Sequence, residues 1–561
     1  MPTEKRGSFA LVLHAHLPYV LSHGVWPHGT DWLNEAAAEC YVPLANVFNS
    51  LAHDGISANV TLNVSPVLAE QLADKGFQED FLAYLDQRVE FAEENEKDFH
   101  DTGRPHLEYL AQYWGEHFKT VRRDFVERYD KDLIGAFRRL QDDGHIEIIT
   151  CCATHGYLPL LGRDACVQAQ VRTGVDTYRR HFGRDPKGIW LPECAYRPRY
   201  RWLSPLADAD TPGPAVERLG VEEVLHDAGI RYFFVDSHML QGGKPIGVYL
   251  DRFEALQRLW GQFSKGYEPR EKIGGRTPHR AYLVCPDASG ERATAFFVRD
   301  EDTAVQVWSG ENGYPGGHRY WRVTDCKADL GDKLLYEPDR VEERLDSHAW
   351  HFTDMLADVL ADDPLAADGQ GVVCAPYDCE LFGHWWSEGP RWVEEVLRRL
   401  HADGRVQAVT CSQYLADSPP AEVVSLPEGS WGEGGFHWIW LNEWTERAWG
   451  HVYEAEDTFL ELLEKHRDTA DDTLTALLKQ AARELLLLES SDWEFLISTW
   501  SARDYAENRI AIHFSDFGRL AKTIEAYAAR GSLTAEEERD VEALRTRDGL
   551  FADIDLDAWR L

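Results

Sequence analysis

Carboxylates follow two apolar runs of this chain, and they are the side chains needed to cleave a glycosidic bond. The segment APYDCELFGHWW, residues 375–386, contains Asp378 and Glu380, and Glu193 follows the apolar stretch GIWLP. Such cleavage uses one carboxylic acid to protonate the leaving oxygen and one carboxylate to meet the developing oxocarbenium ion. Spacing alone leaves two alternatives open. A carboxylate could simply pair with an arginine such as Arg197, or Glu380 could act in place of Asp378, because residues two apart in an extended chain point the same way.

Histidines end two further runs and raise a rival interpretation. His14 and His16 follow FALVL, and His155 follows IEIITCCAT. Imidazoles with an acidic residue could bind Zn²⁺, which would indicate a metal-dependent carbohydrate deacetylase. The H-x-H pair is a weak signal of a metal site, and no further clear ligand cluster accompanies it. A chelator separates the two hypotheses, because it would inactivate a deacetylase and leave a retaining glycosidase active.

Several of the twenty tryptophans lie in sequence that is typical of loops. Trp308 stands in QVWSGENGYPGG, Trp431 in GSWGEGG and Trp440 in FHWIWLNEW. Indole faces stack on the apolar faces of pyranose rings, and ligand contacts concentrate on loops. Core packing is the alternative for any one tryptophan. A non-catalytic glucan-binding protein would keep these residues and would have no need of two carboxylates.

The elements that must position these residues are short apolar runs ending in polar side chains. They are FALVLHAH, ANVTLNVS, IEIITCCATH, GIWLPE, YFFVDSH, ATAFFVRD, GVVCAPYD and VQAVTCS. Near-continuous hydrophobicity is typical of parallel strands covered on both faces, and helical patterns lie between the runs. The alternation predicts an α/β barrel, in which active sites lie at the carboxyl ends of the strands. A doubly wound sheet stays an alternative, because strand order cannot be read from one sequence.

Residue 415 marks a change of pattern. SPPAEVVSLPEGSWGEGG is rich in proline and glycine, and long helical patterns follow it, such as DDTLTALLKQAARELLLLESSDW. We therefore predict a catalytic barrel over residues 1–415, with an inserted loop or subdomain at about 237–292. Residues 416–561 are predicted to form a linker and a helical domain that contributes to the active-site cleft.

The composition excludes some classes of partner. The chain has 58 basic and 96 acidic side chains, a net charge of −38, which argues against nucleic acid or an anionic membrane surface. Its N-terminus has no apolar run long enough for a signal peptide. Ten cysteines without a C-x-x-C pair predict reduced core thiols and a cytoplasmic protein.

Five ordered motifs resemble glycoside hydrolase family 57. They are HAHLPY, THGYLPLL, WLPECAYRP, YDCELFGHWW and SSDW, and FFVRDEDTAVQVWSGENGYPGG with RYWRVTD resembles the 1,4-α-glucan branching enzyme group of that family. The resemblance runs from about residue 8 to about residue 520. It implies an incomplete (β/α)7 barrel followed by a helical domain, no cofactor and no metal.

The resemblance also implies roles for particular residues. Glu193 would be the nucleophile and Asp378 the general acid/base, with carboxyl groups ~5–5.5 Å apart as a retaining mechanism requires. The other residues, implied to contact the glucan, are His14, His16, His155, Trp308, Trp431, Trp440 and Asp492. The family's shielding loop carries a tyrosine in Pro-x-Tyr-Gly, where this chain has Pro-Ile-Gly at 245–247. Tyr249 is the candidate replacement.

These observations together predict a retaining branching enzyme that acts on α-glucan as a monomer or small homo-oligomer. An α-amylase or 4-α-glucanotransferase of the same family is the alternative.

Overall fold

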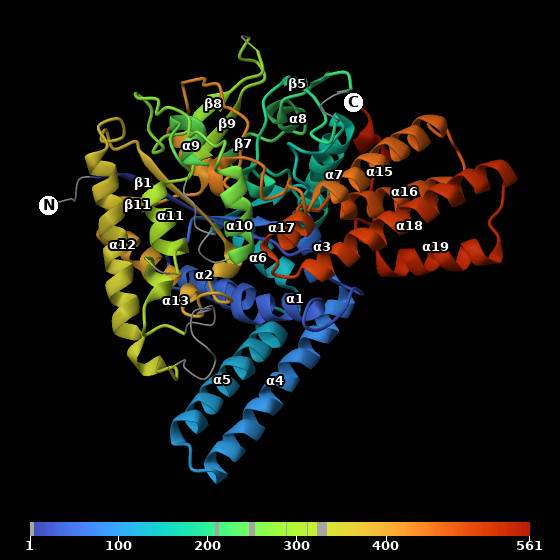
Figure 1. The fold of residues 1–561 in the computed structure, drawn as a ribbon. Coiled ribbons are helices and arrows are strands. Elements are labelled where there is room, and N and C mark those ends of the chain that lie inside the picture. Colours follow the sequence, from blue (N-terminus) through green and yellow to red (C-terminus); the bar gives the residue numbers. More distant parts are fainter. Residues whose placement is uncertain (1–4, 208–212, 246–252, 288, 311, 322–333) are drawn as a thin grey trace. The chain divides into compact units, whose positions relative to one another are not determined.

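The computed structural model describes residues 5–207, 213–245, 253–287, 289–310, 312–321 and 334–561 (Figure 1). Tyr249 and Ile246, which bear on the predicted shielding loop, lie outside these residues. Within the described ranges, no helix combines the length and the apolarity needed to cross a membrane.

A six-stranded sheet has the order β10-β1-β2-β3-β4, with β11 paired to β1. The strands are β1 (Gly7–Ala15), β2 (Val60–Val64), β3 (Ile146–Cys151), β4 (Ile189–Trp190), β10 (Val372–Asp378) and β11 (Val406–Ala408). Every residue of β1 and of β2 is buried, which explains why these strands lack an alternating pattern. A second sheet, β7-β9-β8, comprises β7 (Tyr232–Val235), β8 (Tyr282–Val284) and β9 (Thr294–Val298). A parallel bridge between Gly188 and Tyr232 joins the ends of β4 and β7.

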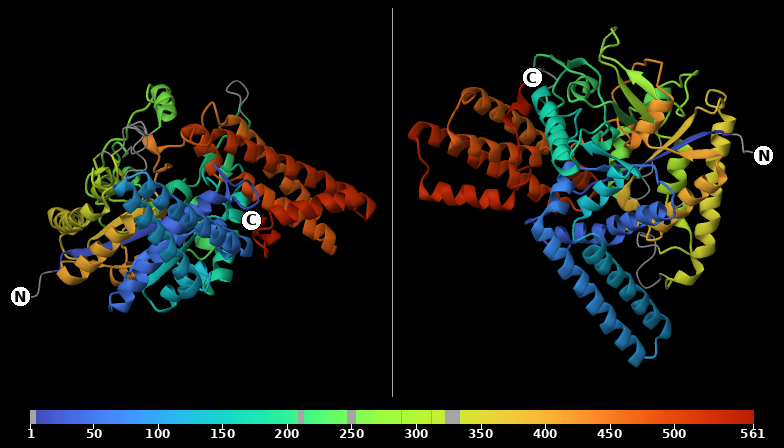
Figure 2. Two further views of the ribbon diagram at one scale, coloured as in Figure 1. Left: turned by 90° about the horizontal axis from the view of Figure 1, so that it is seen from below. Right: turned by 180° about the vertical axis from the view of Figure 1, so that it is seen from behind.

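Helices follow the strands as the sequence predicted. Among them are α6 (Leu133–Asp142), α7 (Asp164–Phe182), α11 (Glu301–Trp308), α12 (Glu342–Asp362) and α13 (Gly389–Asp403). The last of these ends at Gly404, whose φ of 73° is a left-handed conformation that glycine adopts without steric cost. The helices α4 (Lys75–Asp101) and α5 (Pro105–Arg123) run side by side as a long hairpin in every view (Figures 1 and 2).

The C-terminal region is helical. It contains α15 (Glu446–Lys465), α16 (Asp472–Leu488), α17 (Asp492–Thr499), α18 (Arg503–Arg530) and α19 (Ala535–Arg547). The apolar positions that predicted α16 are all buried, from Leu474 to Leu486, because they form the face that packs against α15 and α18. The predicted fold, an incomplete barrel with a parallel sheet followed by a helical region, is confirmed.

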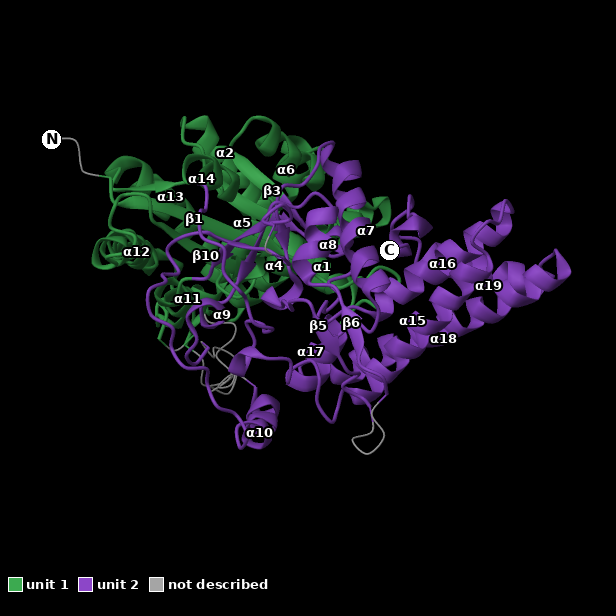
Figure 3. Cartoon of the chain, turned by 90° about the horizontal axis from the view of Figure 1, so that it is seen from above, with its two compact units in different colours: residues 1–62, 68–148, 300–418 green, residues 63–67, 149–299, 419–561 purple. Residues whose placement is uncertain are grey.

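The chain divides into two compact units (Figure 3). Unit 1 comprises residues 1–62, 68–148 and 300–418, and unit 2 comprises residues 63–67, 149–299 and 419–561. Each unit is therefore built from segments far apart in the sequence. The predicted division at residues 415/416, with an insertion at about 237–292, stays a prediction.

Candidate active site

Glu193 lies in unit 2, in a tight turn directly after β4. The turn spans Pro192–Cys194, and Glu193 itself has φ 60° and ψ 23°. A non-glycine residue rarely adopts this left-handed conformation, which costs about 1–3 kcal/mol and is retained where surrounding contacts impose it. The Glu193 side chain is 15% exposed. The turn therefore holds a partly accessible carboxylate in one strained conformation at the carboxyl end of a sheet strand.

Trp431 holds both the backbone and the side chain of Glu193. Its amide N–H donates to the Glu193 carbonyl oxygen at 3.0 Å, and its indole Nε1–H donates to Glu193 Oε2 at 2.8 Å. The indole ring meets Trp190 edge to face, with centroids 5.1 Å apart, and is 7% exposed. Trp431 is thus a hydrogen-bond donor to the candidate nucleophile as well as an aromatic surface.

His155 approaches the other oxygen of Glu193. Its Nδ1 lies 3.9 Å from Glu193 Oε1 and 2.9 Å from the hydroxyl of Ser491. The backbone of His155 also has a positive φ, 62°, and its carbonyl accepts from the Ser491 amide at 3.1 Å. The strained residue is therefore fixed by the segment that precedes α17.

Asp492 begins α17 immediately after Ser491. Its Oδ2 accepts from the Ser490 hydroxyl at 2.6 Å, and Ser490 forms an antiparallel bridge with Gly156. Unit 2 thus brings together four of the predicted site residues: Glu193, His155, Trp431 and Asp492. Ser491, which the sequence analysis did not select, is the hydroxyl that orients His155.

A buried ion pair, Asp236 with Arg299, lies beneath Trp431. Arg299 donates to both oxygens of Asp236 at 3.1 and 2.9 Å, and its guanidinium carbon lies 5.5 Å from the Trp431 ring centroid. Burial opposes ionisation of Asp236, but Arg299 and His238 outweigh it, and the pKa of this carboxyl falls below its usual range. The parallel register of β7 and β9 pairs Val235 with Val298. Asp236 and Arg299, which follow these two residues, therefore lie next to each other. Both residues stand at the ends of apolar runs, in VDSH and VRD, but the sequence alone does not pair them.

Trp440 is 1% exposed and stacks on Tyr157 with centroids 4.6 Å apart. The hydroxyl of Tyr157 lies 2.9 Å from His437 Nδ1, and His437 Nε2 lies 3.0 Å from Glu428. Trp440 therefore packs in an aromatic and polar network in this structure, and its predicted contact with glucan stays a prediction.

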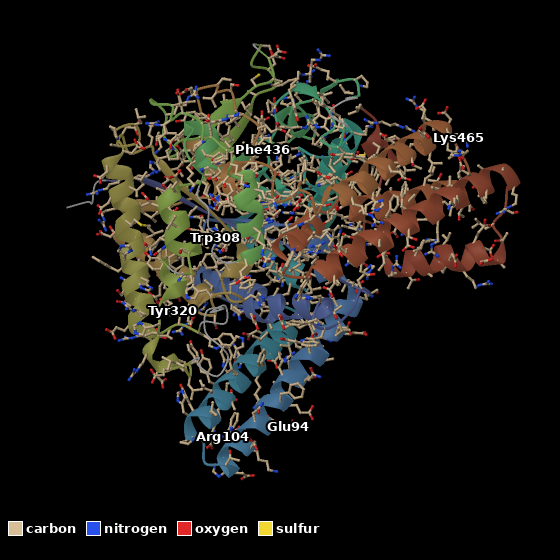
Figure 4. All side chains as sticks on the ribbon, in the orientation of Figure 1. Glu94, Arg104, Trp308, Tyr320, Phe436 and Lys465 are labelled. Atoms are coloured by element: carbon tan, nitrogen blue, oxygen red, sulfur yellow. The ribbon has the colours of Figure 1, made fainter. Side chains whose placement is uncertain are left out.

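Phe436 is an exposed aromatic residue to which no motif in the sequence pointed. It is 42% exposed and stands in the same segment as Trp431 and Trp440 (Figure 4).

Asp378 lies in unit 1 at the end of β10. The register of β1 and β10 places His14 directly opposite Asp378. The ring of His14 is nearly parallel to that of His16, with centroids 5.7 Å apart. Unit 1 thus brings His14, His16 and Asp378 together at the carboxyl ends of neighbouring strands.

Glu380, the competitor of Asp378, is committed to structural hydrogen bonds. Its Oε1 accepts from the Tyr41 hydroxyl at 2.5 Å and from the His16 amide at 3.1 Å, and the residue is 9% exposed. Burial raises its pKa, although these hydrogen bonds act in the opposite direction. Residues 379–381 form a 3-10 turn, so the rule for an extended chain does not apply here. Asp378 is the less buried carboxylate of the two.

Trp308 is the last residue of α11 in unit 1 and is half-buried (Figure 4). The predicted carboxyl separation of ~5–5.5 Å stays a prediction, because Glu193 belongs to unit 2 and Asp378 to unit 1.

Two buried clusters in unit 2 have side chains that could ligate a metal. Cys166, Glu456 and Glu489 form one, and Glu484, His513 and Asp548 form the other, each with its candidate ligand atoms within 4.8 Å of one another. In the second cluster His513 Nδ1 lies 2.9 Å from Glu484 and Nε2 lies 2.9 Å from Arg509, so both ring nitrogens already have partners.

Known protein families and relatives match nearly the whole chain. The profile "Glycosyl hydrolase family 57" matches residues 10–427, and the profile "1,4-alpha-glucan branching enzyme, C-terminal" matches residues 451–559. A 1,4-α-glucan branching enzyme of Thermococcus kodakarensis is 39% identical over 564 residues, which cover 98% of this chain and 78% of the relative.

Two solved structures are similar to this one over its full length. A branching enzyme from Pyrococcus horikoshii has a TM-score of 0.85 and 37% identity, covering 99% of this chain and 97% of its own. The α-amylase AmyC from Thermotoga maritima has a TM-score of 0.76 and 26% identity, covering 99% of each chain. The resemblance found in the motifs is confirmed, and the chain belongs to glycosyl hydrolase family 57.

Proposed function

We propose that this chain is a 1,4-α-glucan branching enzyme in which Glu193 is the nucleophile and Asp378 the general acid/base. The observation that carries the proposal is the 39% identity to a branching enzyme over 98% of the chain, together with a matching C-terminal domain. The substrate is therefore an α-glucan.

The first step forms a covalent glycosyl-enzyme. A carboxylate oxygen of Glu193 attacks the anomeric carbon while the α-1,4 bond breaks, and Asp378 gives its proton to the leaving 4-oxygen. The Trp431 N–H bound to Oε2 fixes the orientation of the carboxylate. His155, held by Ser491, lies beside Oε1.

The second step transfers the chain. Asp378 takes the proton of a glucose 6-hydroxyl, the 6-oxygen attacks the anomeric carbon, and the bond to Glu193 breaks, which leaves an α-1,6 branch. Water competes with the hydroxyl, so transfer requires a site that excludes water.

Incubation of the protein with amylose and EDTA tests the activity. We expect the α-1,6 anomeric proton signal to grow with few new reducing ends. Reducing ends without α-1,6 signal would favour the second candidate, an α-amylase, which the similarity to the Thermotoga maritima enzyme makes the appropriate alternative. Loss of activity to EDTA would contradict the metal-independent mechanism.

The two carboxylate roles are tested separately. With an activated α-glucoside and sodium azide, Glu193→Ala should yield the β-glycosyl azide, because azide replaces the nucleophile. Asp378→Ala should yield the α-glycosyl azide, because the covalent intermediate still forms. Glu380→Gln is the matched control for Asp378→Asn, since a glutamine oxygen can accept the same hydrogen bonds from Tyr41 and His16. Equal loss of activity in both amide variants would overturn the assignment to Asp378.

A further inference from the structure

A pair of tryptophans, one exposed and one half-buried, stands at the far end of α17 from Asp492. The rings of Trp444 and Trp500 have centroids 5.3 Å apart and are tilted by 40°. Trp500 is 46% exposed and Trp444 is half-buried. Large aromatic side chains with this much exposed surface commonly mark binding sites when they occur together. Neither residue belongs to the site described above.

The backbone at Trp500 favours a different residue from the one present. Trp500 follows the last residue of α17 and has φ 58° and ψ 17°. This is the left-handed helix-end position that glycine, and sometimes asparagine, fills without strain. A bulky aromatic residue kept in a strained conformation indicates a requirement for the side chain itself.

Hydrogen bonds connect the loop that bears Trp444 to the helix that precedes Trp500. Asn442 donates from Nδ2 to the Ser498 hydroxyl at 2.8 Å, and its Oδ1 accepts from the Trp444 amide at 3.0 Å, so the loop bearing Trp444 is tied to α17. Little conformational entropy is therefore lost when a ligand binds there.

Two arginines flank the rings. The Arg503 guanidinium carbon lies 5.8 Å from the centroid of each ring, and that of Arg258, on α10 (Glu254–Phe263), lies 5.4 Å from the Trp500 centroid. Arginine presents several N–H donors in a planar fork, which can pair with adjacent hydroxyl groups. Indole rings with arginine donors beside them match both parts of a pyranose: its apolar face can stack on an indole, and its hydroxyls can accept from a guanidinium.

We infer that Trp444 and Trp500, with Arg258 and Arg503, form a distal binding platform for an α-1,4-glucan chain. The eight residues of α17 separate the platform from Asp492 by about 12 Å at 1.5 Å per residue. A long glucan chain bound near Glu193 can therefore also contact the platform, whereas a short oligosaccharide can bind near Glu193 without contacting it. The inference rests on the proposed function only for the identity of the polymer. The platform favours long chains and does not act on the reacting bond.

Binding of glycogen, measured as retardation in native gels, tests the platform without turnover. The comparison uses Glu193→Gln, which leaves the polymer intact, alone and combined with Trp500→Gly or Trp444→Ala. We expect either tryptophan change to weaken glycogen binding about three- to tenfold, the effect of one aromatic contact. Trp500→Phe should restore most of the loss. Trp350→Ala, which removes a 57% exposed tryptophan from α12, is the matched control and should bind as the parent does.

Stability measurements separate binding from packing. Because glycine suits the backbone at position 500, Trp500→Gly should keep the melting temperature within a few degrees of the parent. In the otherwise active enzyme the same change should raise KM for amylose and leave kcat on a short malto-oligosaccharide unchanged. Glycogen binding equal to that of Trp350→Ala, or binding lost only together with the fold, would overturn the platform. A wild-type protein that makes no α-1,6 bonds would overturn the proposed function and leave the binding result standing.

Discussion

The hydrogen bond from Trp431 to Glu193 is the contact whose loss is most informative about catalysis. Trp431→Phe removes the N–H that donates to Glu193 Oε2 at 2.8 Å and keeps a ring against Trp190 and Arg299. A hydrogen bond to a charged group contributes about 1.5–3 kcal/mol. Glu193 is 15% exposed, so water can partly replace the donor, and the lower half of that range applies. Since each 1.36 kcal/mol is a factor of ten, we expect kcat/KM to fall ~10- to 45-fold.

The assay is the rate of α-1,6 bond formation from amylose, with thermal unfolding as the check on folding. Trp438→Phe is the matched control, because Trp438 lies in the same segment and its indole N–H donates to the backbone carbonyl of Glu433 rather than to Glu193. This control should stay within about twofold of the wild type. If Trp431→Phe keeps wild-type kcat/KM, or if both variants lose activity equally, the hydrogen bond does not support catalysis and our reasoning about Glu193 is wrong.

Three further changes test the surrounding network by denaturant or thermal unfolding. Asp236→Asn leaves Arg299 buried without its charge partner and should cost about 3–5 kcal/mol; a smaller loss than 1 kcal/mol would contradict a buried pair. Glu380→Ala leaves the Tyr41 hydroxyl without its acceptor and should cost about 1–3 kcal/mol. Burial raises the pKa of Glu489 from 4.5 to about 8. Between these two pH values the folded protein binds a proton that the unfolded chain has lost, so the stability of the wild type falls as the pH rises from 4.5 to about 8. Glu489→Gln should therefore gain stability over the wild type by up to about 5 kcal/mol between those pH values, and a constant difference would refute the shift.

The sheet strands were predictable because strands buried on both faces have near-continuous runs of apolar residues. Each of the eight apolar runs contains a strand, from β1 to β11, and β1 shows why, since all nine of its residues are buried. The sequence of the long hairpin of α4 and α5 has no comparable pattern. Among the residues of α4, burial is confined to Phe77, Phe81, Tyr84 and Leu85 near its start, so most of the helix is exposed and its pattern says little about where it packs.

The three tryptophans selected as glucan platforms look alike in sequence, since all stand in loop-like segments near glycine or polar residues. Their environments differ: Trp431 donates to Glu193, Trp440 is enclosed against Tyr157, and Trp308 ends a helix. Partners that come from distant segments decide this difference, and local sequence does not contain them. The same reason explains why Ser491 and Arg299 were not selected, because each acts through a residue more than sixty positions away.

The choice between Asp378 and Glu380 shows what spacing can and cannot decide. Two carboxylates two residues apart are equivalent only while the chain stays extended, and β10 ends at Asp378. The 3-10 turn over residues 379–381 sends Glu380 to the Tyr41 hydroxyl, where its acceptor capacity is used for structure. A general acid/base must instead exchange its proton with substrate, which requires accessibility, and Asp378 is the less buried of the two. The register of β1 and β10 also places His14 directly opposite Asp378. Asp378 is therefore the carboxylate that unit 1 makes available, and if Glu380→Gln proved as inactive as Asp378→Asn, accessibility would not be what distinguishes them.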